Sequence, residues 1–136
     1  AEQTDYRENF IRLQAEFANY KRRTDEERKT VFDMGASDVL TGIVDVLDDF
    51  ELALKNTADN EFKKGMELIY AKIISMGEGY GLERIKTIGE LFNPECHEAL
   101  LAVESDKPSQ TILEEMQSGY SVKGKIIRTA KVKVAK

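Results

Sequence analysis

The chain has 136 residues and a net charge of −5, and it combines 33% charged with 41% apolar residues. That many charges do not fit a compact domain of this size with one core, and that many apolar residues exclude a disordered chain. No apolar run approaches the roughly 20 residues that a membrane span needs, so no membrane is expected. The single cysteine, Cys96, excludes an internal disulfide framework and fits a reducing compartment.

Residues 1–36 are predicted to form a long coiled-coil helix. Apolar side chains recur three or four residues apart at Phe10, Leu13, Phe17 and Tyr20, and the stripe resumes at Val31. The rest of the chain is too short to cover this stripe, which favours self-association; a packed helix of a monomeric bundle is the alternative. The seam turns polar between Thr24 and Arg28, so we expect the paired helices to melt before the C-terminal part.

Residues 37–80 are predicted to form a helical hairpin. Ser37 or Asp38 suits the N-cap of its first helix, residues 56–60 are typical of a turn, and the glycines from Gly77 onward end the second helix. Two helices of this length bury too little surface alone, whereas two copies would complete a four-helix bundle. The side chains expected to face the second copy are Ile43, Leu47, Phe50, Ile69 and Ile73.

Residues 81–136 change to a two-residue alternation, which predicts a compact, mainly β domain. Candidate strands span residues 99–103, 112–116, 125–128 and 131–134, with a hairpin turn at Lys123-Gly124 and a loop at residues 106–109. The fold class is therefore α+β: a long dimerising helix, a helical hairpin that forms a four-helix bundle in the dimer, and a small C-terminal β domain.

The titratable side chains do not form a pattern that favours catalysis. Cys96 and His97 are adjacent, and neighbours on a strand or helix point apart, so they are poorly placed to exchange a proton. His97 is the only histidine, so no metal set or oriented base is complete. The prediction is a non-enzyme without metal or cofactor, in which His97 holds the turn at residues 92–94 by a hydrogen bond and Cys96 is inert.

Two charged regions have simple alternatives to a binding role. Four acidic residues, Asp45, Asp48, Asp49 and Glu51, follow closely in the sequence, and their spacing places Asp45, Asp48 and Asp49 on one helical face. No loop or Gly lets the backbone surround a calcium ion there, which favours a solvated face. The last eighteen residues hold six basic side chains and no acidic one. They protect an edge strand, dock on an acidic protein surface, or do both. The acidic middle of the chain argues against nucleic acid as a partner.

Five segments, met in order along the chain, resemble the GrpE family. They are RLQAEFANYKRR at residues 12–23, IVDVLDDFELAL at 43–54, KGMEL at 64–68, LFNPECHEA at 91–99, and the glycine-punctuated run at 119–134. Asp45 stands where the family usually has Pro, and Leu52 stands where it usually has Arg. Five matches in the right order leave little room for coincidence.

The resemblance implies a homodimeric nucleotide exchange factor that binds the nucleotide-binding domain of a DnaK-type chaperone and promotes ADP release, so assisting protein folding and the stress response. It implies chaperone contacts at Phe92, Pro94, Met116, Lys125, Arg128, Val134, Lys21, Arg22, Lys55 and Asn56. The alternative function is a structural coiled-coil adaptor whose β domain binds an unrelated partner. The expected compartment is the cytoplasm, or an organelle matrix if the chain, which begins at Ala1, is a processed form.

Overall fold

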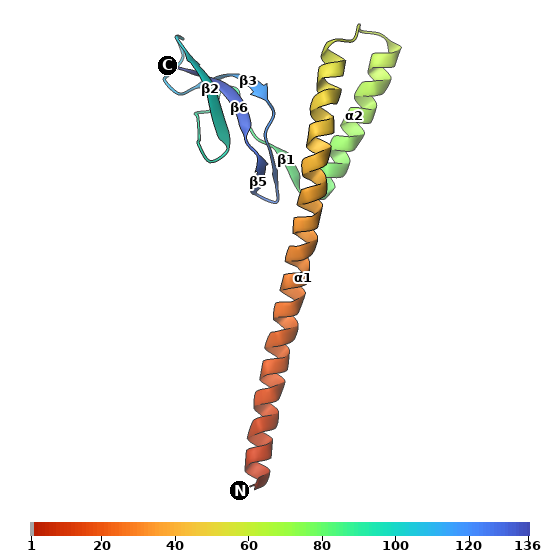
Figure 1. Ribbon diagram of the computed structural model, residues 1–136, viewed down its shortest axis with the longest axis vertical. Coiled ribbons are helices and arrows are strands. Elements are labelled where there is room, and N and C mark those ends of the chain that lie inside the picture. The colour runs from red at the N-terminus through yellow and green to blue at the C-terminus, as the bar shows by residue number, and fades with distance from the viewer. Residues whose placement is uncertain (1) are drawn as a thin grey trace. The chain divides into compact units, whose positions relative to one another are not determined.

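The computed structural model describes residues 2–136, over which two helices precede six strands (Figure 1). Their bounds are α1 Glu2–Lys55, α2 Glu61–Gly79, β1 Leu82–Arg84, β2 His97–Val103, β3 Ile112–Gln117, β4 Tyr120–Val122, β5 Lys125–Arg128 and β6 Ala130–Ala135. This order confirms the α+β class. The chain divides into two compact units, one that ends at Ala36 and one that comprises Ser37–Lys136. The predicted division into three parts stays a prediction.

Helix α1 runs without interruption through the point where a second helix was expected to begin. The prediction of an N-cap at Ser37 or Asp38 is wrong, because nothing near it breaks the helix. There is no Pro, and a Gly such as Gly35 weakens a helix by only about 1 kcal/mol relative to Ala. The Ser37 carbonyl also accepts a hydrogen bond of 2.8 Å from the Thr41 hydroxyl one turn later.

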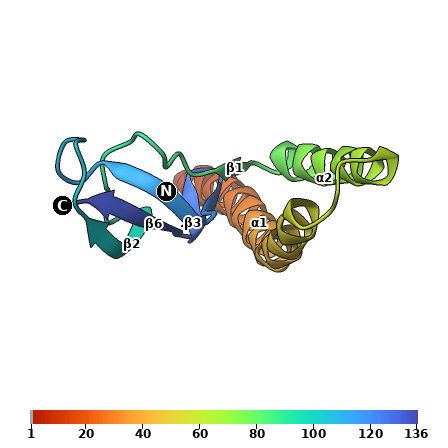
Figure 2. The ribbon, with the colours of Figure 1, turned by 90° about the horizontal axis from the view of Figure 1, so that it is seen from above.

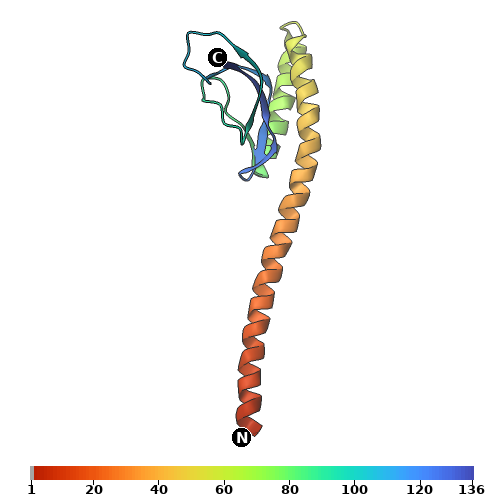
Figure 3. The same ribbon diagram turned by 60° about the vertical axis from the view of Figure 1, so that its left-hand side comes forward.

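The helical hairpin within Ser37–Lys136 has the predicted turn at residues 56–60. The Asn60 side chain caps α2 by accepting a hydrogen bond of 3.0 Å from the Lys63 amide. The last turns of α1 and helix α2 lie side by side (Figure 3), and the rings of Phe50 and Tyr70 are 5.9 Å apart. Helix α2 ends at Gly79, as the glycines predict.

The β domain contains two three-stranded sheets. One has the order β2-β6-β3, with β2 parallel and β3 antiparallel to β6, and Figure 2 shows β6 between its neighbours. The other is antiparallel, with the order β1-β4-β5. The four predicted strands are confirmed. Lys123 and Gly124 both have positive φ, 50° and 82°, which confirms the tight hairpin turn between β4 and β5.

Two apolar clusters form the core of Ser37–Lys136. The inner faces of β3 and β6 supply the first, made of Ile112, Ala130, Val132 and Val134. The second joins different elements: Leu40 and Val44 of α1 pack with Leu82, Tyr120 and Val122 of β1 and β4. The β domain is therefore seated directly on the second part of α1, in addition to being joined to α2 through the glycine-rich segment.

Candidate partner-binding surface

The predicted contact residues of the β domain do not share one environment. Lys125 and Pro94 are exposed, Met116 is about half exposed, and Phe92 packs partly against the core of the β3–β6 sheet. Val134 is only 3% exposed. The prediction of a contact at Val134 is corrected here, because the alternation of β6 points this side chain into the core, where it cannot reach a partner.

The predicted contact residues of the helices are all exposed, namely Lys21, Arg22, Lys55 and Asn56. Lys55 and Met116 line the same hollow of about 340 Å³ within Ser37–Lys136, together with Leu52 of α1 and with Gln117 and Ser118 at the end of β3. The structure thus brings one helical and one β-domain candidate together. Lys21 and Arg22 belong to the unit that ends at Ala36.

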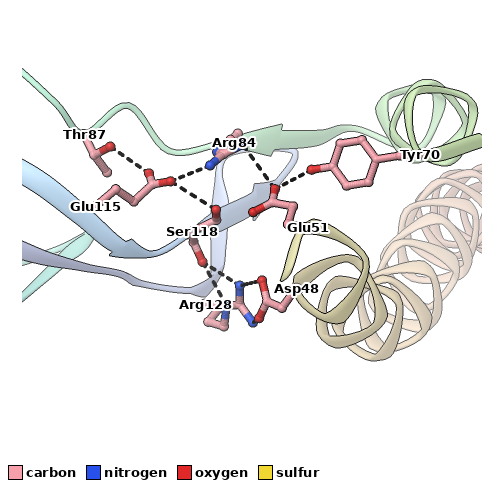
Figure 4. A network of polar contacts seen from close by, with 8 residues as sticks. All are labelled: Asp48, Glu51, Tyr70, Arg84, Thr87, Glu115, Ser118 and Arg128. Carbon is pink, nitrogen blue, oxygen red and sulfur yellow. Dashed lines mark hydrogen bonds and ion pairs between the residues drawn. The ribbon is translucent and has the colours of Figure 1, made fainter. Parts of the chain in front are cut away.

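Arg128 is already engaged inside the chain (Figure 4). Its guanidinium donates to both carboxylate oxygens of Asp48 on α1, at 2.5 and 2.8 Å. It also donates to the Ser118 carbonyl through Nε at 3.0 Å and through a terminal nitrogen at 2.6 Å. Asp45, one of the two departures from the family pattern, lies 3.4 Å away. The Arg128 side chain is 19% exposed, so little of it is open to a partner.

A second ionic link joins α1 to the β domain, through strands β1 and β3. Arg84 on β1 reaches Glu51 on α1 at 3.4 Å and Glu115 on β3 at 2.5 Å. Glu51 in turn accepts a hydrogen bond from the Tyr70 hydroxyl on α2. Burial and this bond raise the pKa of Tyr70 well above its ordinary value, so the hydroxyl stays a donor. One chain of polar contacts therefore connects both helices with two strands (Figure 4).

Glu115 is the most enclosed carboxylate of this network, with a side chain 12% exposed. Its oxygens accept hydrogen bonds from Thr87 at 2.7 Å and Ser118 at 3.1 Å, besides the contact with Arg84. Burial alone would raise the pKa of Glu115, but these bonds and the Arg84 charge lower it below its ordinary value of 4.5. Bonds to Asp48 likewise raise the pKa of Arg128 against the effect of burial. Glu115 and Arg128 are therefore both charged at neutral pH.

The acidic residues of α1 are not the solvated face that their spacing suggested. Asp48 and Glu51 are each about one quarter exposed and bind arginines of the β domain, so that prediction is wrong for these two. Asp49 remains exposed. Within residues 2–136, no group of His, Cys, Asp or Glu side chains is arranged to hold a metal ion.

His97 has the role that the sequence predicts. Its Nδ1 accepts a hydrogen bond of 3.0 Å from the Asn93 amide, which closes the turn at residues 92–94, and its Nε2 lies 2.8 Å from the Lys86 carbonyl. Burial and the neighbouring Glu95 raise the pKa of the Cys96 thiol. The thiol therefore stays protonated at neutral pH, where it is a weak nucleophile.

The residues predicted to form the dimer fall into two groups. In the first part of α1, Phe10, Leu13, Phe17, Tyr20 and Val31 are all more than half exposed, and Ile69 of α2 is half exposed. Phe50, Ile73 and Ile43 are partly buried, Ile43 against the cluster that seats the β domain. Leu47 is corrected: it is buried inside the chain, since Leu40, Val44 and Leu47 share the helical face that the rest of Ser37–Lys136 covers.

Asp48, Arg84, Glu115 and Ser118 were not predicted from the sequence to be members of one network. The ion pairs of Arg84 with Glu115 and of Arg128 with Asp48 join residues 31 and 80 positions apart, whereas Ser118 lies 3 residues from Glu115 and 10 from Arg128. The local signal, an arginine in each of two strands and acids on a helix, does not say which charges meet.

In the part of the chain that the structure describes, neither helix is long and apolar enough to cross a membrane.

Comparison of the sequence with known proteins identifies the family of the chain. The GrpE family matches residues 1–136. Relatives named Protein GrpE include those of Desulfatibacillum aliphaticivorans, 37% identical over 99% of this chain and 69% of the relative, and Oceanobacillus iheyensis, 40% identical over 93% and 68%. The protein of Staphylococcus carnosus is 36% identical over 98% of this chain and 70% of its own. The chain belongs to the GrpE family and spans about two thirds of the length of these relatives.

Proposed function

We propose that this chain is an adenine nucleotide exchange factor, which binds the nucleotide-binding domain of a DnaK-type chaperone as a homodimer and promotes ADP release. Membership of the GrpE family supports this function. The structural observation that carries it is the β domain seated on α1 by an apolar cluster and two ionic links. It offers a partner a firm surface at a fixed angle rather than a catalytic cleft.

The exchange step follows from linked equilibria. A nucleotide held between two lobes leaves slowly while both lobes grip it, and a protein that prefers the open-lobed state raises the population of that state. The same coupling acts in reverse, so nucleotide binding weakens the hold of the exchange factor on the chaperone. The chain itself needs no nucleophile or metal, and it acts where such chaperones fold proteins, in the cytoplasm.

The dimer is supported by the unpaired apolar stripe in the first part of α1. Its Phe and Leu side chains at Phe10, Leu13 and Phe17 are 60–65% exposed. Each would gain about 1.5–3 kcal/mol on full burial. A second copy presents the same stripe at the same spacing, which is the condition for a coiled-coil seam.

The test is the release of a fluorescent ADP analogue from a DnaK-type chaperone in stopped flow, with and without this protein. We expect acceleration that weakens when the exposed Lys125 and Met116 are both changed to Ala. A chain that is folded and dimeric but leaves the release rate unchanged would contradict the proposal and favour the adaptor function.

A further inference from the structure

We propose that Arg128 and Asp48 are positioning residues for exchange: together they fix the angle of the β domain on α1, and Arg128 does not itself touch the chaperone. The proposal rests on the exchange function proposed above and assigns to Arg128 a different part in it. If Arg128 and Asp48 act together as positioning residues, variants of either one should have the same effect on exchange. A direct contact of Arg128 with the chaperone predicts different effects, so an experiment can distinguish the two roles.

The hydrogen bonds of Arg128 are directed inward. All three guanidinium nitrogens donate to partners within the chain, to the Asp48 carboxylate and to the Ser118 carbonyl. The guanidinium also lies 5.7 Å from the centre of the Tyr120 ring. A partner protein would have to break these bonds to recruit the charge, and removing one member of a part-buried pair is costly.

The anchor on the β-domain side is rigid. Gly119 follows Ser118 and lies so close to β6 that a Cβ atom there would come within 2.8 Å of the Ala130 Cα. The Gly119 carbonyl accepts a bond of 2.9 Å from the Ile85 amide. The Ser118 carbonyl is therefore held between two sheets, and Arg128 transmits that position to α1 through Asp48.

The two kinds of contact between α1 and the β domain do different things. The apolar cluster of Leu40, Val44 and Tyr120 holds the surfaces together, but burial is not directional and tolerates a change of angle. The two parallel bonds from Arg128 to Asp48 fit only one relative orientation. Arg84 bridges Glu51 and Glu115 on the other side of Ser118, so the angle is fixed at two places (Figure 4).

This arrangement predicts how exchange responds to substitution. A β domain that can tilt distinguishes the open-lobed chaperone less well, so the maximal release rate at saturating exchange factor falls. We expect Asp48→Asn and Arg128→Ala each to lower that rate, by on the order of tenfold. The double variant should be no slower than either single one. Arg128→Lys keeps the charge but loses the two parallel N–H donors of the guanidinium, and should behave like Arg128→Ala.

Two matched controls come from the same elements. Asp49→Asn changes an exposed carboxylate next to Asp48 and should leave release unchanged. Lys125→Ala removes an exposed charge from the same strand as Arg128. It should raise the concentration needed for half-maximal release and leave the maximal rate intact, as a direct contact does.

The angle itself is measured by the distance between spin labels at Glu67 on α2 and Lys107 in the loop between β2 and β3, in a Cys96→Ser background. Labelled chains are diluted with unlabelled ones, so that each dimer carries one labelled copy at most. We expect one narrow distance for the unaltered protein and for Asp49→Asn. We expect a broadened distribution for Asp48→Asn, Arg128→Ala and Arg128→Lys, all compared below their unfolding temperatures.

The opposite results would overturn the proposal. If Arg128→Ala slows release far more than Asp48→Asn, and the double variant adds the two losses, Arg128 contacts the chaperone directly. An unchanged distance distribution in these variants would also reject it. If the unaltered protein fails to accelerate release, the exchange function falls, while the distances still decide whether Arg128 sets the angle.

Discussion

The first part of α1, up to Ala36, and the second part, from Ser37 to Lys55, carry apolar side chains at the same helical spacing but in different surroundings. In the first part Phe17 is 65% exposed, and no side chain is buried. In the second part Val44 is 1% exposed, and Leu40 and Leu47 lie beside it on the same face. The same spacing produces a helix in both parts, but only in the second part are the apolar side chains buried by other residues of the chain.

The difference separates two sources of stability. The second part is stabilised by its own β domain, through side chains that are buried in a single copy. In the proposed dimer the apolar surface of the first part is covered only by the second chain, so the stability of this part should depend on protein concentration. Substitutions in the two parts should therefore be read by different measurements.

The largest expected effect is that of Val44→Asp in the second part. It places an unpaired carboxylate in the cluster with Tyr120 and Val122, and should destabilise Ser37–Lys136 by more than about 3 kcal/mol. Phe17→Asp in the first part should change the stability of the same unit by less than about 0.5 kcal/mol. Urea unfolding followed by the amide NMR signals of β6 measures both.

Two outcomes bear on this comparison. Val44→Thr is the matched control, because it nearly keeps the volume and replaces one methyl group by an uncharged hydroxyl, and its stability should fall between those of the unaltered protein and Val44→Asp. Equal destabilisation by Phe17→Asp and Val44→Asp would show that the two parts of α1 unfold as one, and the distinction between them would be lost.

A smaller effect is expected for Phe17→Ala, which acts on the paired helices of the proposed dimer. Heating should remove helix in an early step, because the seam is polar between Thr24 and Arg28, and the β domain should unfold later. Phe17→Ala removes about 2 kcal/mol of burial per chain. It should lower the midpoint of the first step by several degrees without moving the second. Circular dichroism at 222 nm showing one cooperative transition would contradict this.

The elements were predictable where a single segment carries its own signal. The alternation of β6, the Lys123-Gly124 turn and the turn at residues 56–60 are all local, and each is found where expected. Strands β1 and β4, of three residues each, are too short to show a period. The helix break expected at Ser37 is absent. A residue that suits an N-cap does not interrupt a helix when the neighbouring residues also favour helix.

The candidate site was less predictable, because its key contacts join distant segments. Arg128 was predicted to contact the chaperone, and that contact stays a prediction, but the structure shows that Arg128 binds Asp48, 80 residues away. Nothing local selects Asp48 among the acids of α1. Val134 and Leu47 illustrate the same difficulty. A sequence shows that a side chain is apolar, but whether it meets a partner or its own core depends on the packing of the whole unit.

The third prediction concerns acid stability through Glu115. The folded state lowers the pKa of this carboxyl below 4.5, so the unfolded state binds the proton more tightly. The stabilisation that the ionised Glu115 supplies is complete above its ordinary pKa of 4.5, and it is lost as the pH falls through the lower pKa of the folded state. Glu115→Gln should therefore be less stable than the unaltered protein at pH 7, by about 1–2 kcal/mol. The gap should narrow below pH 4.5.

The partners of Glu115 are the cation Arg84 and the hydroxyls of Thr87 and Ser118. Of these groups only Glu115 changes its protonation in the acid range. Urea unfolding of both proteins at a series of pH values measures the gap. If the free energies of unfolding of the two proteins differ by the same amount from pH 7 to pH 3, the ionisation of Glu115 does not contribute to stability. The loss in Glu115→Gln would then come from the changed hydrogen bonding and packing alone.

The smallest effect should come from the ion pair of Arg23 and Glu27 in the first part of α1. Their charged atoms are 3.7 Å apart, one helical turn along, and both side chains are 68% exposed. Water and salt screen such a pair, so Glu27→Gln should change helix stability by no more than about 0.5 kcal/mol, and by less in 1 M salt. Circular dichroism of the helix at low and high salt tests this. A loss as large as that of Glu115→Gln would show that this pair is enclosed in the assembled protein, and that the first part of α1 acquires by association the burial that the second part has from its own chain.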